Sequence, residues 1–176
     1  MAANRNMLLN DQNNQFQPAH GRIDTVDATN LNLIRGGTSS ADINRNGDNY
    51  VYYCWHSVPG FSAIGSYNGS NNSNGPYIYC GFRPAFILAK AYKNAGTPWL
   101  IYDAARNSYN PLNTQLEPSS TGSEQSVTNN TFDFCSSGFK VRGTGGTATN
   151  SSDGIIYMAF AEHPFGGANV SPSPAR

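Results

Sequence analysis

The sequence is poor in charge, in cysteine and in long apolar runs. Charged residues make up 12% of the 176 residues, and 11 basic side chains balance 11 acidic ones. A phosphate backbone or an anionic membrane surface is bound through clustered lysine and arginine. The balanced charge therefore excludes the electrostatic footprint of a nucleic-acid-binding protein, and we expect neither nucleic acid nor membrane lipid as a partner.

Segments that would direct the chain to or through a membrane are also lacking. No window approaches the roughly 18 consecutive apolar residues of a membrane-spanning helix. The start of the chain, MAANRNMLLNDQNNQF, has no basic end followed by an apolar run, which predicts no signal peptide and synthesis in a cytoplasm. Apolar residues at helical spacing are not sustained over three turns, so helix is predicted to be a minor component.

Cysteine and histidine occur only as isolated residues. The cysteines are Cys54, Cys80 and Cys135. None belongs to a C-x-x-C pair and each lies in an apolar or aromatic run, which favours buried free thiols, although one disulfide stays open. The histidines are His20, His56 and His163. They lack the close cysteine or histidine partners of a metal site, so neither a metal nor another cofactor is predicted.

Aromatic residues and turn formers are abundant, with 10 Tyr, 9 Phe, 18 Gly and 10 Pro. This mixture favours many short strands joined by tight turns. Runs rich in Tyr, Phe, Val and Ile have strand length and are bounded by Gly, Pro, Asn or Ser. The predicted strands are Tyr50–His56, Tyr77–Phe82, Ala85–Tyr92, Trp99–Tyr102, Phe132–Cys135, Gly138–Arg142 and Ile155–Ala161.

Two of these runs, PAFILAKAY and IIYMAFAEH, are apolar at both alternating sets of positions, which is typical of strands covered on both faces. The sequence therefore predicts an all-β fold, a two-layer antiparallel β-sandwich of jelly-roll or lectin-like type with an extended N-terminal arm. The predicted domains are an arm with an orphan hairpin strand over residues 1–47, the sandwich over 48–167, and a C-terminal tail over 168–176.

One internal repeat is suggested by the alignment of Ile34–His56 with Val141–His163 without gaps. Each copy is predicted to form a hairpin, because each has a short strand, a loop that ends in a turn signal, and an aromatic strand. The first hairpin would lack a sheet of its own. Two strands alone are marginal in water, so we expect this hairpin to dock on its own module, on a neighbouring subunit or on another protein.

Candidate catalytic groups have weak support in the sequence. Strand alternation would place Cys54 and His56 on one face, but no orienting acid or amide accompanies them, and we expect no catalytic residues there. Paired carboxylates are the chemistry of glycan hydrolysis. Asp103, Asp133 and Glu162 lie in or beside predicted strands, so a sandwich-fold glycan hydrolase stays open as an alternative.

Two polar loops, Tyr67–Pro76 and Tyr109–Glu124, are the candidates for recognition. They are rich in Tyr, Asn, Ser and Gly, the residue types that adaptable binding surfaces use. The candidate binding residues are Tyr67, Asn68, Asn71, Asn74, Tyr109 and Asn110. The alternative that these loops are solvated connectors stays open.

Four motifs carry a resemblance to a known family. They are WHSVPGF at Trp55–Phe61, GFRPAF at Gly81–Phe86, WLIYD at Trp99–Asp103 and AEHPF at Ala161–Phe165. The region from about Asn49 to Phe165 resembles a module that recurs in virion proteins of tailed phages, notably tail-fibre-like chains of marine phages. The resemblance implies a structural or adhesive role rather than an enzymatic one.

From this resemblance we expect a phage virion structural protein located in a tail fibre, a spike or a capsid decoration. Its expected partners are other virion proteins and copies of itself, with a symmetric trimer favoured. The alternative is a receptor- or glycan-binding tip of a tail fibre, which would act in host attachment on a surface glycan or receptor. The glycan hydrolase is the second alternative.

Overall fold

The computed structural model describes residues 7–9, 11–15, 22–27, 29–34, 47–143 and 148–166. Within these ranges all regular structure is β-strand in antiparallel pairs, which confirms the predicted all-β class. The strands are β1 (Arg22–Val26), β2 (Leu31–Ile34), β3 (Ser62–Tyr67), β4 (Tyr77–Tyr79), β5 (Pro84–Ala91), β6 (Leu100–Asp103), β7 (Thr114–Gln115), β8 (Gln125–Ser126), β9 (Phe132–Cys135), β10 (Gly138–Val141) and β11 (Ile155–Ala161). In the same part of the chain, no helix is long and apolar enough to cross a membrane.

The chain divides into two compact units. The first, which we call the hairpin unit, comprises Met1–Met7 and Gln15–Trp55, and the second, which we call the body, comprises Leu8–Asn14 and His56–Arg176. The predicted division at residues 47 and 167 stays a prediction, because much of the predicted arm and all of the predicted tail lie outside the described residues.

Strands β1 and β2 form a two-stranded antiparallel sheet with a register shift between Ile23 and Thr25. Asp27 organises the turn, because its Oδ1 accepts the backbone N–H groups of Thr29 at 2.8 Å and Asn30 at 2.7 Å. A side-chain oxygen that bonds backbone groups two and three residues ahead is an Asx turn. The sequence analysis missed this hairpin, since its strands hold no aromatic residue.

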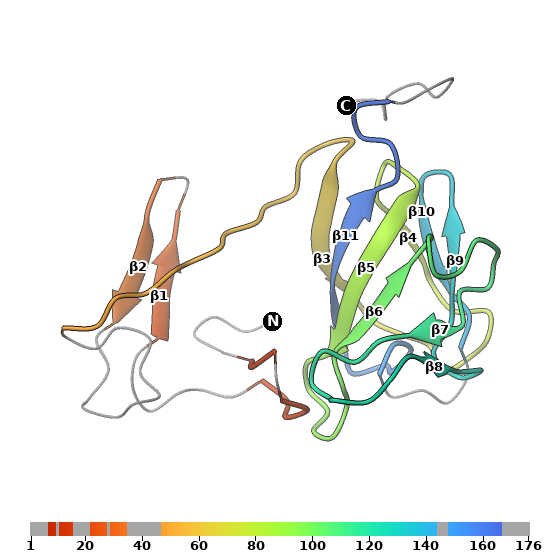
Figure 1. Cartoon of the computed structure of the whole chain (residues 1–176), viewed down its shortest axis with the longest axis horizontal. Coiled ribbons are helices and arrows are strands. Elements are labelled where there is room, and N and C mark those ends of the chain that lie inside the picture. Colours follow the sequence, from red (N-terminus) through yellow and green to blue (C-terminus); the bar gives the residue numbers. More distant parts are fainter. Residues whose placement is uncertain are drawn as a thin grey trace. The chain divides into compact units, whose positions relative to one another are not determined.

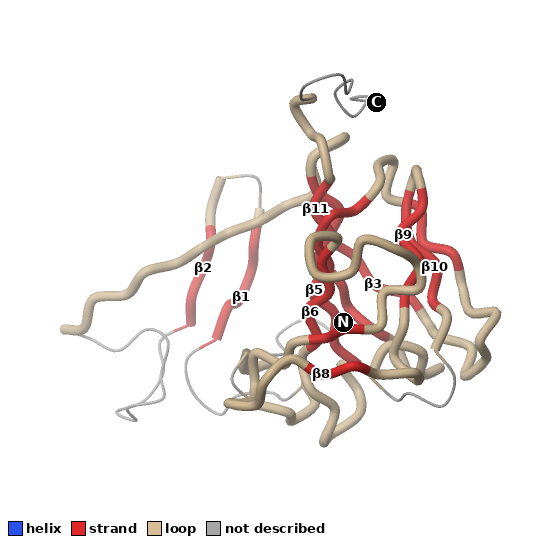
Figure 2. Tube along the Cα trace, turned by 45° about the vertical axis from the view of Figure 1, so that its right-hand side comes forward, coloured by secondary structure: helices blue, strands red, loops and turns tan. Residues whose placement is uncertain are grey.

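The body contains two larger sheets and one small one. The strand order is β3-β11-β5-β6 in the four-stranded sheet and β4-β10-β9 in the three-stranded sheet, and β7 pairs with β8 (Figures 1 and 2). The segment between β6 and β8 connects the large sheets, because Leu116 bridges Ile101 of β6 and Leu112 bridges Phe132 of β9. This segment closes one side of the body.

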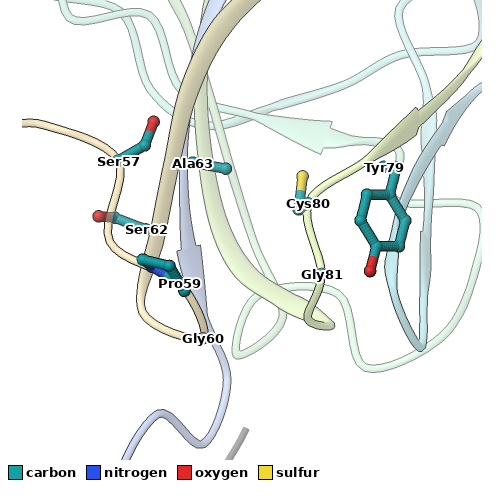
Figure 3. A pocket seen from close by; sticks show the side chains of 8 residues that line it. All are labelled: Ser57, Pro59, Gly60, Ser62, Ala63, Tyr79, Cys80 and Gly81. Atoms are coloured by element: carbon teal, nitrogen blue, oxygen red, sulfur yellow. The ribbon is translucent and has the colours of Figure 1, made fainter. Parts of the chain in front are cut away.

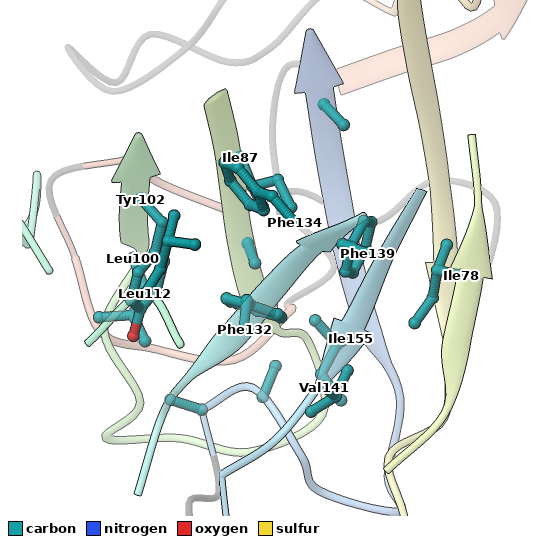
Figure 4. Packing of buried hydrophobic residues seen from close by; sticks show 14 of the residues in the cluster. Ile78, Ile87, Leu100, Tyr102, Leu112, Phe132, Phe134, Phe139, Val141 and Ile155 are labelled. Carbon is teal, nitrogen blue, oxygen red and sulfur yellow. The ribbon is translucent and has the colours of Figure 1, made fainter. Parts of the chain in front are cut away.

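One hydrophobic core lies between the two large sheets (Figure 4). The four-stranded sheet contributes many small side chains, and the facing three-stranded sheet contributes large rings. Buried small residues include Ala89, Ala91 and Ala159, each 0% exposed. The Phe139 ring packs edge-on against the rings of Tyr157 at 5.2 Å and Phe132 at 5.5 Å between centroids. Small residues opposite large ones let the layers interdigitate at high density.

The three-stranded sheet requires a glycine at position 138, because the neighbouring strand lies too close for a side chain there. A Cβ atom on Gly138 would lie 2.0 Å from the carbonyl oxygen of Ile78 on the paired strand β4. No real side chain fits at that distance, so the pairing of β10 with β4 depends on glycine at this position.

Two sequence-based predictions about strands are wrong. Tyr50–His56 is extended without being paired in a ladder, and the strand before β4 is Ser62–Tyr67 instead, which pairs with β11. Val141–His163 is not a hairpin either, because β10 and β11 belong to different sheets. Apolar alternation predicts that a segment has two different faces but does not identify its pairing partner. The first copy of the proposed repeat lies partly outside the described residues.

We predict that Phe139→Ala lowers the free energy of unfolding of the body by about 3–5 kcal/mol, because it removes a fully buried ring from the core. Urea denaturation followed by near-UV circular dichroism measures the change. Phe165→Ala is the matched control, since the Phe165 ring is 82% exposed and its loss should cost less than about 1 kcal/mol. Equal losses for the two variants would contradict the position of the core.

A second prediction concerns the hairpin unit. Backbone and side-chain hydrogen bonds from Thr29 and Asn30 lower the pKa of Asp27 from 3.8 to about 2. Because the folded pKa lies below the unfolded one, the turn gains stability above pH 3.8 and loses it as the pH falls toward 2. The amide resonances of Thr29 and Asn30 in NMR spectra should titrate with a midpoint near 2, and Asp27→Asn should abolish this titration. A midpoint at 3.8 would argue against the Asx turn.

Candidate interaction surfaces and an edge pocket

Tyr67, the first predicted binding residue, is the last residue of β3 and is half-buried. Its hydroxyl donates to Thr149 O at 2.7 Å, and its ring contacts those of Phe139 and Tyr157 at centroid distances of 5.9 and 6.1 Å. Burial raises the pKa of Tyr67 well above its ordinary value. The structure therefore gives this ring a packing role against the core.

Asn68, Asn71 and Asn74 are exposed on the loop between β3 and β4. Their loop is held by Asn150, a fully buried residue that sequence reasoning missed. The Asn150 side chain donates to Asn72 O at 2.8 Å and to Gly143 O, and accepts from Ser70 N at 2.8 Å. No motif marks Asn150 in the sequence, since its partners come from distant loops.

The remaining predicted pair lies on the loop after β6. Tyr109 is 86% exposed. The side chain of its neighbour Asn110 donates to Phe134 O at 3.0 Å and accepts from Phe134 N at 2.9 Å, so this amide bonds β9 as a neighbouring strand would. Asn110 thus positions the loop, and Tyr109 offers an open ring beside a fixed backbone.

The two predicted loops lie at opposite ends of the four-stranded sheet. Tyr67 and Ala91 both pair with Ile155, so the Asn68–Asn74 loop follows the end where β5 finishes. Asp103 pairs with Phe86 near the start of β5, so the Tyr109 loop follows the other end. The six candidate residues are therefore not brought together on one surface.

The three candidate catalytic acids each form an ion pair with an arginine. Arg83 Nε lies 2.8 Å from Glu162 Oε2, Arg106 Nη2 lies 3.4 Å from Asp103 Oδ2, and Arg142 Nε lies 3.2 Å from Asp133 Oδ2. Asp133 belongs to the three-stranded sheet, whereas Asp103 and Glu162 belong to or follow strands of the other sheet. Each of the three carboxylates therefore has a different arginine as its ion-pair partner.

The expectation that Cys54 is a core thiol is wrong, because the residue is exposed. Tyr50–His56 does not form the predicted strand, and outside a sheet this segment has no buried face for the thiol. Cys80 and Cys135 are half-buried, and all three cysteines are free, so the disulfide alternative is not observed. The ring nitrogen Nδ1 of His56 lies 2.9 Å from Ser57 O.

An exposed aromatic strip runs through the end of the hairpin unit from Tyr50 to Trp55. The rings of Tyr50 and Tyr52 stack at a centroid distance of 6.2 Å, and those of Tyr53 and Trp55 stack at 6.0 Å. Tyr53 is 76% exposed and Trp55 is 56% exposed. Adjacent exposed aromatic side chains of this kind mark interaction sites in soluble proteins.

A pocket of about 310 Å³ lies between the edge strands β3 and β4, on the side of the body away from β6 and β9 (Figure 3). Its lining residues are Ser57, Pro59, Gly60, Ser62, Ala63, Tyr79, Cys80 and Gly81. Figure 3 shows the Ala63 and Cys80 side chains pointing into the gap between the strands. This volume is at the lower limit of small-molecule sites.

The polar groups around this pocket are already bonded. Ser57 Oγ accepts from Ile64 N at 2.9 Å and donates to Ile64 O at 3.3 Å, which caps the outer edge of β3. Ser62 Oγ donates to His56 O at 2.8 Å. Burial raises the pKa of the Cys80 thiol to about 12, so it remains protonated and unreactive. The pocket is therefore suited to an apolar group rather than to catalysis.

The outer faces of the two large sheets differ in chemistry. On the four-stranded sheet, paired positions place one apolar row on the surface, because residues directly opposite in a sheet share a face. This row is Ile64, Met158, Leu88 and Ile101. In the next row Phe86 and Phe160 pair, with ring centroids 6.0 Å apart, and Phe61 packs edge-on against Phe160. We call these seven residues the apolar sheet face.

The outer face of the three-stranded sheet is polar. Lys140 is paired in register with Asp133 on one side and Tyr77 on the other, so all three side chains share this face. Lys140 Nζ donates to Gly75 O at 2.8 Å, and Asp133 binds Arg142. One face of the body therefore carries charges that water can solvate, and the opposite face carries apolar side chains.

No three His, Cys, Asp or Glu side chains among the described residues gather closely enough to hold a metal ion.

The cysteine environments lead to a testable difference in reactivity. Cys54 is exposed, whereas burial raises the pKa of Cys80, and alkylation requires the thiolate. Iodoacetamide at mildly alkaline pH should therefore modify Cys54 at least about tenfold faster than Cys80, as measured by peptide mass spectrometry. Cys54→Ser should remove the fast phase, and equal rates for both thiols would refute this account of the pocket.

Neither a curated protein nor a solved structure matches the chain. A protein-family comparison matches residues 1–164 to a family described as a domain of unknown function, DUF7483. The matched region includes the hairpin unit as well as nearly all of the body. The chain therefore belongs to the DUF7483 family.

Proposed function

We propose that this chain is a phage virion structural protein that works by assembling with copies of itself and with other virion proteins. The virion setting rests on the resemblance of the Asn49–Phe165 region to tail-fibre-like modules. A tail fibre, a spike or a capsid decoration is the proposed location. The assembling role rests on the apolar sheet face, as argued below.

The fold proposed for the body is a two-layer antiparallel β-sandwich of jelly-roll or lectin-like type, preceded by an extended arm. Two sheets that share one core, with side chains from both inner faces, support this classification. The body presents two outer faces to its surroundings and one open side, between β3 and β4, and the chemistry of these surfaces determines what the protein can bind.

The contrast between the two outer faces is the observation that carries the proposal. Edge and outer positions of a solvated sheet are normally polar, as they are on the three-stranded sheet. The apolar sheet face departs from this rule across the full width of the four-stranded sheet, from Ile64 at one edge to Ile101 at the other. Continuous apolar surface of this kind indicates a protein interface.

We assign a second copy of this chain as the partner for this face. The apolar sheet face contains no charged residue, and Asp103 at its margin is bound to Arg106. An apolar partner surface is therefore required, and the chain itself presents the exposed rings of Phe165, Tyr53 and Trp55. Closed symmetric assemblies are the usual form of soluble homo-oligomers, and a trimer is the proposed state.

A non-enzymatic role is part of this proposal. The ion pairs of Asp103, Asp133 and Glu162 support it, because a carboxylate bound to arginine is a poor general acid. Asp133 also lies on a different sheet from Asp103 and Glu162.

A receptor- or glycan-binding tip is the second candidate function. The specific observation in its favour is Tyr109, which is 86% exposed next to the fixed amide of Asn110. A rigid exposed tyrosine gives contact area at low entropy cost. Binding of the intact protein to host cells, and its loss in Tyr109→Ser, would distinguish this function from a purely structural one.

The assembling role predicts that Ile64→Lys converts the oligomer to a monomer. Ile64 is 36% exposed on edge strand β3, so a lysine can reach water there, while its charge opposes burial against another copy. Size-exclusion chromatography with light scattering should show about three times 19.0 kDa for the unaltered chain and 19.0 kDa for the variant.

Tyr109→Lys is the control for this experiment, since it adds the same charge to an exposed ring outside the apolar sheet face. It should leave the oligomer intact. Circular dichroism confirms that each variant is folded. An unaltered chain that stays at 19.0 kDa at the highest attainable concentration would overturn the proposed function.

A further inference from the structure

The segment Leu8–Asn14, which we call the strap, belongs to the body although it precedes the hairpin unit in the chain. It lies against the end of β5 and the turn that follows. Gln12 O accepts hydrogen bonds from Gly96 N at 3.0 Å and from Lys90 Nζ at 3.3 Å. The strap therefore interacts with the body in the manner of a bound peptide.

Both ends of the strap are also bonded. The indole nitrogen of Trp99 donates to Leu8 O at 2.8 Å, and the side-chain amide of Asn14 donates to Lys93 O at 3.2 Å. Side chains of the strap contribute little, since Leu8 and Leu9 remain 48% and 54% exposed. The body thus recognises mainly the backbone path, through hydrogen bonds that are individually weak in water.

The body surface that the strap contacts, which we call the strap site, is formed by Lys90, Lys93, Gly96 and Trp99. Lys90 gives this site a requirement for an occupant. Its side chain is 0% exposed, and Nζ donates to Thr97 O at 2.5 Å in addition to Gln12 O. Burial lowers the pKa of Lys90, and the negative charge of Asp11 on the strap opposes that shift. A buried ammonium needs its hydrogen-bond acceptors, so removal of the strap leaves this amine with one acceptor fewer.

The connection between strap and body does not dictate which copy of the strap fills the strap site. The 41 residues from Gln15 to Trp55 form the separate hairpin unit between them. A connection of this length reaches far beyond the dimensions of one domain when extended, at about 3.3 Å per residue. The same contacts are therefore available to a strap from a neighbouring copy, as in segment exchange between identical chains.

We propose that the strap is exchanged between copies in the assembled protein, so that Leu8–Asn14 of one copy occupies the strap site of the next. The inference rests on the assembling role proposed above and names the contact that links the copies. Lys90 pairs with Ile156 on β11, in the row next to the apolar sheet face. An exchanged strap therefore extends the proposed interface without a break.

Cross-linking of two full-length chains tests this exchange. Both chains carry Cys54→Ser to remove the exposed thiol, one carries Asn14→Cys, and the other carries Lys93→Cys with a larger tag. The two chains are produced together and treated with a short bis-maleimide. A covalent product with the summed mass of both chains is expected, whereas its absence would overturn the exchange.

Two controls define the specificity of the cross-link. Asn14→Cys combined with Tyr109→Cys places the second thiol on the loop after the opposite end of the sheet and should give no product. Trp99→Phe keeps an aromatic side chain but replaces the indole and so removes the N–H donor to Leu8 O, and should lower the yield of the mixed product about threefold to tenfold. An unchanged yield would show that the strap site does not hold the exchanged strap.

Light scattering on the same samples separates failure of this inference from failure of the proposed function. If the protein is an oligomer but Asn14→Cys and Lys93→Cys react only when both are placed in one chain, the exchange is refuted and the assembling role is retained. A monomer that cross-links only within one chain would refute both. A mixed cross-linked oligomer supports both.

Discussion

The body depends on the packing of large rings from one sheet over small side chains of the other. Phe132 and Phe139 on the three-stranded sheet occupy the space that Ala89 and Ala159 leave on the four-stranded sheet. Because small inner residues use little of the core volume, their strands approach the facing rings closely. Large apolar side chains of the same strands lie on both faces, in the core and on the apolar sheet face. The core therefore encloses only part of the apolar surface of these strands.

The β6/β9 side and the β3/β4 side of the two sheets differ in whether a connecting segment covers the strand edges. On the side of β6 and β9, the bridges of Leu116 to Ile101 and of Leu112 to Phe132 satisfy strand edges with a connecting segment. On the side of β3 and β4 no such connection is made among the described residues, and a pocket remains there. The Ser57 hydroxyl caps the β3 backbone at Ile64, which protects this edge from further strand pairing. The proposed association accordingly uses the sheet face and the strap rather than edge-to-edge pairing.

Polar side chains position the segments that connect these layers, and two of them, Asn150 and Lys90, are buried. Asn150 bonds the loop after β3, Asn110 bonds β9, and Lys90 bonds the strap. Each of these side chains bonds backbone groups from a segment far away in the chain, and a buried polar group without such partners is costly. The loops are therefore held in defined conformations although their compositions are those of solvated connectors. This organisation suits a protein that presents fixed surfaces to partners in an assembly.

The sequence by itself determined the all-β class, the positions of β5, β9, β10 and β11 within a few residues, and the exposure of Tyr109. These features follow from local properties, namely β propensity, turn residues and solvation. The tertiary structure alone decided that Ser62–Tyr67 is a strand while Tyr50–His56 is not, that Tyr67 packs on the core, and that Asn150 and Lys90 are buried. An alternating sequence pattern does not show which face of a strand is buried. The sequence also does not show whether a polar side chain will find a hydrogen-bond acceptor in a distant segment. Those choices depend on contacts between residues far apart in the chain, which no local pattern contains.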